Sequence, residues 1–172
     1  MKFGLVLPNY GSQATRYSIL DSAISAENLG FDSIWLTDHL ALPSADANAF
    51  GHIYESMTTL AYLAASTRSI KLGLSTLVLP QRNPLEVAKA IATVDNLSGG
   101  RLIISVGIGW SKGEYKNLGY EFHNRGKRMN EAVKILRTCW RGQTNVHFQG
   151  DYYSFDDVFF SPTPVQSGGP PL

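Results

Sequence analysis

The segment "LGLSTLVLPQRNPLEVAKAIATVDNLSGGRL", residues 72–102, indicates the fold class of the chain. It begins with a continuous apolar run, which is typical of a strand buried on both faces of a sheet. A helical pattern follows from Asn83 to a stop signal at Gly99, and a second apolar run starts at Leu102. Strand, helix and strand in this order predict a βαβ unit with parallel strands.

The helix within this segment has the clearest signals in the chain. Asn83 can cap it, Pro84 suits its first turn, and Glu86 would complete a capping box. An apolar stripe follows at helical spacing: Val87, Ile91, Val94 and Leu97. We therefore predict a helix with one buried face that ends before Gly99.

The same alternation extends over most of the chain. Apolar runs that we predict to be strands occupy residues 2–7, 33–36, 70–79 and 102–106. They begin roughly 30 to 40 residues apart, the length of successive βαβ units. Further helical stripes lie at Ile19, Leu20, Ala23, Ile24 and Leu29, at Met57, Leu60, Ala61 and Ala64, and at Met129, Val133, Leu136 and Trp140. The pattern predicts an α/β protein with a parallel sheet, either an open doubly wound sheet or part of a (β/α) barrel.

The C-terminal region, residues 145–172, breaks this alternation. Strand-like aromatic residues flank Gly150-Asp151, which predicts a β-hairpin, and the tail "SPTPVQSGGPPL" has the composition of a linker. We interpret residues 1–172 as one domain that ends in this hairpin insertion and linker.

Composition excludes several classes of function. The chain has 172 residues, of which 44% are hydrophobic and 17% charged, and its formal net charge is +1. Because the charges form no long runs, neither nucleic acid nor an anionic membrane is an expected partner. The N-terminal apolar run stops at Pro8 and is too short for a signal peptide. We therefore expect a cytoplasmic protein.

Cysteine and histidine give no sign of a metal site. Cys139 is the only cysteine and fits an amphipathic helix, so we expect it in the core. His52, His123 and His147 lack metal-ligand spacing, and we propose no metal.

Polar and aromatic residues follow each predicted strand. In parallel sheets, the loops after the C-terminal ends of the strands hold the ligand. These ends carry Asn9 and Tyr10, Asp38 and His39, "LVLPQRNP", and "GIGWSKGEY". From the residues alone, Asp38 and His39 are either a turn residue beside a surface imidazole or two members of a site.

Three segments together resemble one known family: "GFDSIWLTDHL" (30–40), residues 72–102, and "VGIGWSKGEYKNLG" (106–119). They look like the luciferase-like monooxygenase superfamily, especially its oxidoreductases that depend on the deazaflavin coenzyme F420. The resemblance implies a (β/α)8 TIM barrel that binds a flavin or deazaflavin at its C-terminal mouth. A complete barrel takes roughly 250 residues. We therefore expect a half-barrel, made of the first four βα units plus the C-terminal β-hairpin insertion.

The resemblance also implies roles for two residues after the second strand. Asp38 would help to bind the cofactor, and His39 would be the catalytic residue that assists proton transfer. Imidazole suits this task because it can donate or accept a proton near neutral pH.

Further cofactor contacts are implied at the third and fourth strands. Members of the family place a non-proline cis peptide in the third strand, and alignment puts it between Ser75 and Thr76. The bulged backbone there would support the cofactor ring. Gly109 and Trp110 are expected to line the same pocket.

Substrate contacts are expected from Asn9, Tyr10 and Glu114, which lie near the same strand ends. Relatives that oxidise glucose 6-phosphate carry a tryptophan and a glutamate where this chain has Pro43 and Trp110. The resemblance therefore disfavours glucose 6-phosphate as the substrate.

These observations predict an oxidoreductase that transfers a hydride between coenzyme F420 and a small organic substrate. One alternative is an FMN-dependent luciferase-like monooxygenase, and another is a catalytically empty half-barrel that acts only in assembly. Arg125, Lys127 and Arg128 are expected to form a solvated face. Open edges on the first and fourth strands should let the chain form a homo-oligomer or pair with a missing C-terminal half.

Overall fold

A computed structural model of the chain describes residues 1–48 and 50–172. Within them, four strands form one parallel sheet in the order β1-β2-β3-β4. These strands are β1 (Gly4–Val6), β2 (Ser33–Leu36), β3 (Lys71–Val78) and β4 (Leu102–Gly107). The predicted strands are thus confirmed, with small differences at their ends.

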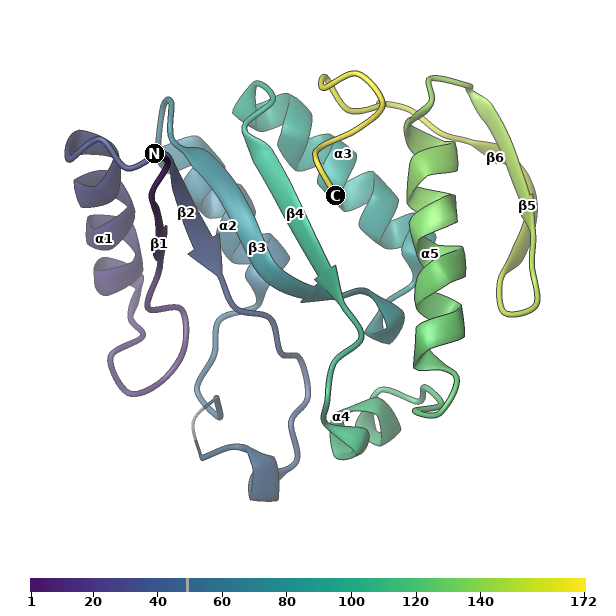
Figure 1. Cartoon of the computed structure of the whole chain (residues 1–172), viewed down its shortest axis with the longest axis horizontal. Coiled ribbons are helices and arrows are strands. Elements are labelled where there is room, and N and C mark those ends of the chain that lie inside the picture. The colour runs from purple at the N-terminus through teal and green to yellow at the C-terminus, as the bar shows by residue number, and fades with distance from the viewer. Residues whose placement is uncertain (49) are drawn as a thin grey trace.

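Three helices connect successive strands of the sheet: α1 (Arg16–Asn28), α2 (Ser56–Ser66) and α3 (Pro84–Ser98). The short α4 (Lys112–Asn117) and the longer α5 (Arg125–Trp140) follow β4. Figure 1 shows α2 and α3 behind the sheet, with α5 beside α3. The core lies between these layers, where Leu72 and Leu74 of β3 and Ile91 of α3 are fully buried. In the described residues, no helix is long and apolar enough to cross a membrane.

The start and stop of α3 follow the predicted signals. The side chain of Asn83 accepts a hydrogen bond from the backbone N–H of Leu85, and Gly99 ends the helix with φ +70°. Two expectations were wrong. Among the described contacts Glu86 completes no capping box. Leu97 is exposed because Asp95 and Ser98 take the buried side of the last turn.

The stripe of α1 is narrower than predicted, and α4 was not predicted. Ile24 and Leu29 are exposed, while Ile19 and Ala23 are buried as expected. Leu29 follows the end of α1 and so lies beyond its packed turns. The helix α4 is short and polar, so no apolar periodicity marks it.

The predicted hairpin consists of β5 (Asn145–Gln149) and β6 (Ser154–Phe159), which form a separate antiparallel pair. Its turn is fixed to α5, because the Glu131 carboxylate accepts hydrogen bonds from the backbone N–H groups of residues 151–153. The hairpin therefore lies beside α5 and away from the sheet (Figure 1).

The tail after the hairpin returns to β4. The backbone N–H of Ile104 donates to the carbonyl oxygen of Pro171 at 2.9 Å. The Gln166 side chain donates to the carbonyl of Leu102 and to the buried carboxylate of Asp95. We expected an unpaired edge on β4, but the tail covers part of it. In the described part of the chain, β1 has only β2 as a neighbouring strand.

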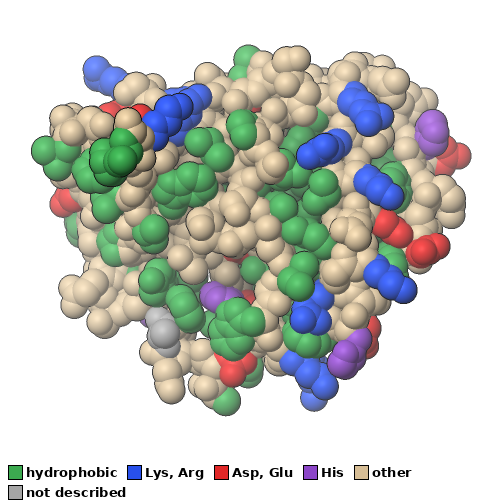
Figure 2. All heavy atoms as spheres, in the orientation of Figure 1, with side chains coloured by type: hydrophobic (Ala, Val, Ile, Leu, Met, Phe, Trp, Pro, Cys, Tyr) green, Lys and Arg blue, Asp and Glu red, His purple; other side chains and the backbone are tan. Residues whose placement is uncertain are grey.

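The sheet face opposite the helices carries a tryptophan set against two glycines. A Cβ added to Gly73 would lie 2.3 Å from Trp35 Cε3, and one added to Gly4 would lie 2.5 Å from Trp35 Nε1. The indole therefore rests against the backbones of β1 and β3. Figure 2 shows hydrophobic side chains across this side of the molecule, while lysine and arginine gather over α5.

We predict that Gly73→Ala destabilises the chain by about 1–3 kcal/mol, because the new methyl group has no room beside Trp35. Gly126→Ala on α5 is the matched control. Nothing lies within 4 Å of a Cβ there, so the change should be neutral or stabilise by up to about 1 kcal/mol. Urea denaturation of both variants is the measurement, and equal free energies of unfolding would contradict this packing.

Candidate functional site

The loops that follow the strands gather at one edge of the sheet. Because β1 to β4 are parallel, their C-terminal ends face the same way. The segment after β2, the turn after β3 and the helix α4 after β4 all lie at this end (Figure 1). The sequence-predicted residues Asp38, His39, Trp110 and Glu114 meet there.

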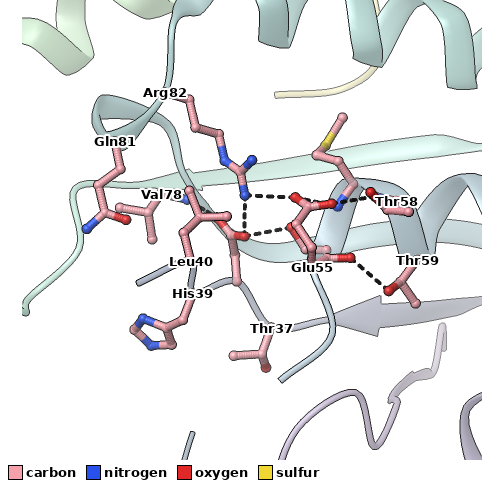
Figure 3. Close-up of polar contacts among 12 residues, drawn as sticks. Thr37, His39, Leu40, Glu55, Thr58, Thr59, Val78, Gln81 and Arg82 are labelled. Carbon is pink, nitrogen blue, oxygen red and sulfur yellow. Dashed lines mark hydrogen bonds and ion pairs between the residues drawn. The ribbon is translucent and has the colours of Figure 1, made fainter. Parts of the chain in front are cut away.

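Asp38 is buried and fully engaged by the protein. Its carboxylate accepts hydrogen bonds from Ser56 Oγ at 2.7 Å, the backbone N–H of Val78 at 2.9 Å and Arg82 Nη2 at 2.6 Å. Arg82 Nη2 also pairs with Glu55 at 3.1 Å (Figure 3). Asp38 therefore ties the end of β2 to the end of β3 and to the start of α2.

Asp38 does not cap the helix that follows it. The N-cap of α2 is Glu55, whose carboxylate accepts from the backbone N–H groups of Met57 and Thr58. Asp38 instead forms hydrogen bonds with residues that are distant in the sequence, at the start of α2 and at the end of β3. Its predicted contribution to cofactor binding stays a prediction.

His39 lies on the other side of this segment, pointing away from the ion pairs of Arg82 (Figure 3). Its Nδ1 is 3.0 Å from Oε2 of Glu114, and both side chains are buried, with exposures of 7% and 1%. Glu114 Oε2 also accepts from Gln81 Nε2 at 3.1 Å. Its Oε1 accepts from the backbone N–H groups of Leu40 at 2.6 Å and Ala41 at 3.1 Å.

These contacts keep the Glu114 carboxyl ionised. Burial by itself raises the pKa of this group, but the hydrogen bonds from His39, from the backbone of residues 40 and 41, and from Gln81 outweigh it. The pKa of Glu114 falls to about 2. Four donors thus hold this buried, ionised carboxylate in one place.

Aromatic side chains surround the imidazole of His39. The ring centroids of Phe50 and Trp110 lie 5.0 and 5.7 Å from it, and Tyr10 packs against Phe50 at 5.0 Å. Trp110 remains 54% exposed, so one of these rings can meet a ligand. Within the described residues, no hydrogen-bond partner occupies His39 Nε2.

The third strand, β3, carries a bulge near its C-terminal end. The peptide bond between Ser75 and Thr76 is cis, at the position that the resemblance implied. The register with β4 shifts between Leu74 and Leu77, which leaves both bulge residues outside the regular ladder. Ser75 is exposed, so this part of the backbone is open to a ligand.

Two residues that we expected to contact substrate, Asn9 and Glu114, are buried and hydrogen-bonded within the chain. Asn9 is fully buried, and its side chain bonds both backbone groups of Thr37. Glu114 is equally buried, as described above. Tyr10 is half-buried and stays a candidate. Gly109 has φ +67°, and a Cβ there would lie 2.7 Å from Val78, so this turn requires glycine.

The basic cluster at the start of α5 is not uniformly solvated. Lys127 is exposed as expected, but Arg128 is only 5% exposed. Its guanidinium donates to the backbone carbonyls of Pro80 and Glu121 and thereby fixes the turn after β3. The expectation failed because one of these partners, Pro80, is distant in the sequence.

Sequence reasoning assigned no role to Gln81 and Arg82. Both lie in the short turn after β3, a segment that we had singled out because it follows a strand end, so their position was the available signal. Among residues 1–48 and 50–172, no three His, Cys, Asp or Glu side chains lie close enough to hold a metal ion.

Comparisons with known proteins point to one family. The sequence model described as luciferase-like monooxygenase matches residues 1–172. An F420-dependent glucose-6-phosphate dehydrogenase from Amycolatopsis mediterranei is 35% identical over 163 residues, covering 88% of this chain and 48% of the relative. An FMNH(2)-dependent dimethylsulfone monooxygenase from Pseudomonas putida is 35% identical over 122 residues, covering 69% of this chain and 33% of the relative.

A solved structure agrees with these relatives. An F420-dependent secondary alcohol dehydrogenase in complex with an F420–acetone adduct matches with a TM-score of 0.82 at 27% identity, covering 96% of this chain and 50% of that one. The chain thus spans about half the length of the curated F420-dependent relatives that it matches.

We predict that Arg82→Met destabilises the chain by about 3–5 kcal/mol, because it leaves the buried Asp38 carboxylate without its cation. Arg68→Met is the control, since Arg68 is exposed and its side chain has no hydrogen bond among the described residues. Chemical denaturation of both variants is the measurement. Similar losses in the two proteins would contradict the structural role of Arg82.

The lowered pKa of Glu114 predicts a loss of stability in acid. A carboxyl group whose pKa is lower in the folded state stabilises the fold above its unfolded value, here 4.5, and loses that contribution as the pH falls toward about 2. The loss should reach about 3 kcal/mol at most. Urea denaturation at several pH values should show a smaller acid loss in Glu114→Gln than in the exposed control Glu86→Gln. Equal acid losses in both variants would refute this linkage.

Proposed function

Because the chain belongs to the luciferase-like monooxygenase family, we propose that it forms the cofactor-facing part of an F420-dependent oxidoreductase. The reaction would be hydride transfer between coenzyme F420 and a small organic substrate, with His39 as the proton donor or acceptor. The observation that carries this proposal is the His39 imidazole, which Glu114 holds through Nδ1 while Nε2 has no partner within the described residues.

The residues at this edge fit a deazaflavin ring. The bulge places the backbone of Ser75 and Thr76 outside the β-ladder, and Trp110, which follows β4, exposes an aromatic surface. These residues, with Gly109, would hold the ring system. When bound, F420 would supply a carbon centre that accepts or donates a hydride.

The chain itself would supply orientation and proton handling. His39 Nε2 can accept a proton from a substrate hydroxyl or return one to a carbonyl oxygen. Phe50 and Trp110 flank the imidazole, and a ligand packed on them would exclude water from it. Asp38 and Arg82 would keep the segment that carries His39 in place.

We propose a small, neutral substrate in place of a sugar phosphate. The side chains around His39 are aromatic, and Arg82 is already paired with Asp38 and Glu55. Pro43 and Trp110 also depart from the pattern of glucose 6-phosphate oxidisers. The relative that binds an F420–acetone adduct supports a secondary alcohol or its ketone as a first probe.

FMN is the second candidate cofactor. The Pseudomonas putida relative, which is FMNH(2)-dependent, has the same identity to this chain as the Amycolatopsis mediterranei relative, although over a shorter segment. The aromatic and backbone contacts described here would suit either ring system.

Binding and turnover test the proposal. Oxidised F420 and FMN should be titrated, by absorbance, into the 172-residue chain and into the same chain continued with the second half of the Amycolatopsis mediterranei relative. We expect F420 to bind the hybrid more tightly than FMN does, and the hybrid to prefer propan-2-ol over glucose 6-phosphate. Tighter binding of FMN would favour the monooxygenase alternative.

In the hybrid, His39→Ala should lower turnover by about 10²–10⁴-fold, as expected for the loss of a general acid or base. His147→Ala is the control, because His147 is exposed on β5. Turnover at the wild-type rate in His39→Ala would end the catalytic assignment of His39.

A further inference from the structure

The two oxygens of the Glu114 carboxylate contact both the backbone and a side chain of the segment after β2. Oε1 accepts from the backbone N–H groups of Leu40 and Ala41, which directly follow His39. Oε2 lies 3.0 Å from Nδ1 of the His39 ring itself. Glu114 therefore fixes the backbone that carries His39 and the imidazole as well.

The chemistry of the carboxylate sets the direction of the bond to His39. An ionised carboxylate has no proton to donate, so the hydrogen in this contact must be on Nδ1. A neutral imidazole carries one ring proton, and in this arrangement Nε2 is left as the acceptor. The described residues offer Nε2 no hydrogen-bond partner, so its lone pair is available to a ligand.

Gln81 limits the freedom of the carboxylate. Its Nε2 donates to the same Glu114 oxygen as His39 does, at 3.1 Å, and its side chain is 2% exposed. With two backbone donors on Oε1 and two side-chain donors on Oε2, rotation of the carboxylate would break several hydrogen bonds at once. Three parts of the fold therefore determine the orientation of the imidazole: the segment after β2, the turn after β3 and the helix α4.

We propose that Glu114 is a positioning residue that holds His39 in its Nδ1–H tautomer, so that Nε2 is the nitrogen that exchanges protons in the reaction. The inference rests on the proposed function of His39 and extends it to a residue that we had expected to contact substrate. When Nε2 takes up a proton from a hydroxyl group, the ring becomes an imidazolium. The Nδ1 proton stays in place, and the Glu114 carboxylate balances the new charge.

The tautomer can be measured without cofactor or substrate. Long-range nitrogen–proton NMR correlations of the histidine rings should be recorded on the 172-residue chain, with His39 assigned by its absence in His39→Ala. At a pH where the ring is neutral, we expect the Nδ1–H form to dominate. A dominant Nε2–H form in the wild-type chain would overturn the inference, whatever the behaviour of any Glu114 variant.

Variants in which glutamine replaces glutamate can distinguish a positioning role of Glu114 from a role in folding. Glu114→Gln should lower the population of the Nδ1–H tautomer, because the amide can donate as well as accept. Glu86→Gln, on the exposed side of α3, should leave it unchanged. An unaltered tautomer population in a folded Glu114→Gln chain would also overturn the inference.

Kinetics of the hybrid enzyme distinguish this inference from the proposed function. Glu114→Gln should lower kcat by between about 10-fold and 10⁴-fold with little change in KM, because it disturbs the proton carrier and leaves the binding surface intact. If His39→Ala lowers turnover and Glu114→Gln does not, the positioning role fails and the proposed function stands. If His39→Ala has no effect, the proposed function of His39 fails first.

Discussion

Burial of the Asp38 carboxylate is the constraint on which the rest of the site depends. A buried carboxylate must be paired and hydrogen-bonded, and its partners here come from the end of β3, the turn after it and the first residue of α2. The hydrogen bonds to this one carboxylate therefore hold three segments at the C-terminal end of β2. The strands of the sheet run in the same direction, and the Asp38 cluster fixes the end of β3 beside the end of β2.

Asp38 and His39 are adjacent in the sequence but contact different parts of the protein. Asp38 faces the ion pairs inside the protein, while His39 points to Glu114 and the aromatic rings. Asp38 holds the backbone beside His39, while Glu114 contacts the imidazole itself. The two ionisable residues after β2 therefore do not share one environment. Asp38 links elements inside the protein, and His39 contacts Glu114 and the aromatic rings.

The sequence predicted those parts of the fold that depend on local signals. Apolar runs marked the strands, and Asn83, Pro84 and Gly99 marked α3, because caps and periodicity act over a few residues. The resemblance placed the cis bond at Ser75-Thr76. The burial of Glu114 and Arg128 could not be predicted in this way, since their partners lie on segments far apart in the chain. Charged residues on short or polar helices look solvated until tertiary contacts are known.

The segment between residues 41 and 55 is held firmly at both of its ends. Glu114 binds the backbone at its start, and Glu55 and Ser56 are bound to Arg82 and Asp38 at its finish. Closing a longer loop between fixed ends costs little, about 0.6 kcal/mol for each doubling of its length. We infer that extra residues could be added within this segment at little cost in stability, because its two ends would stay fixed.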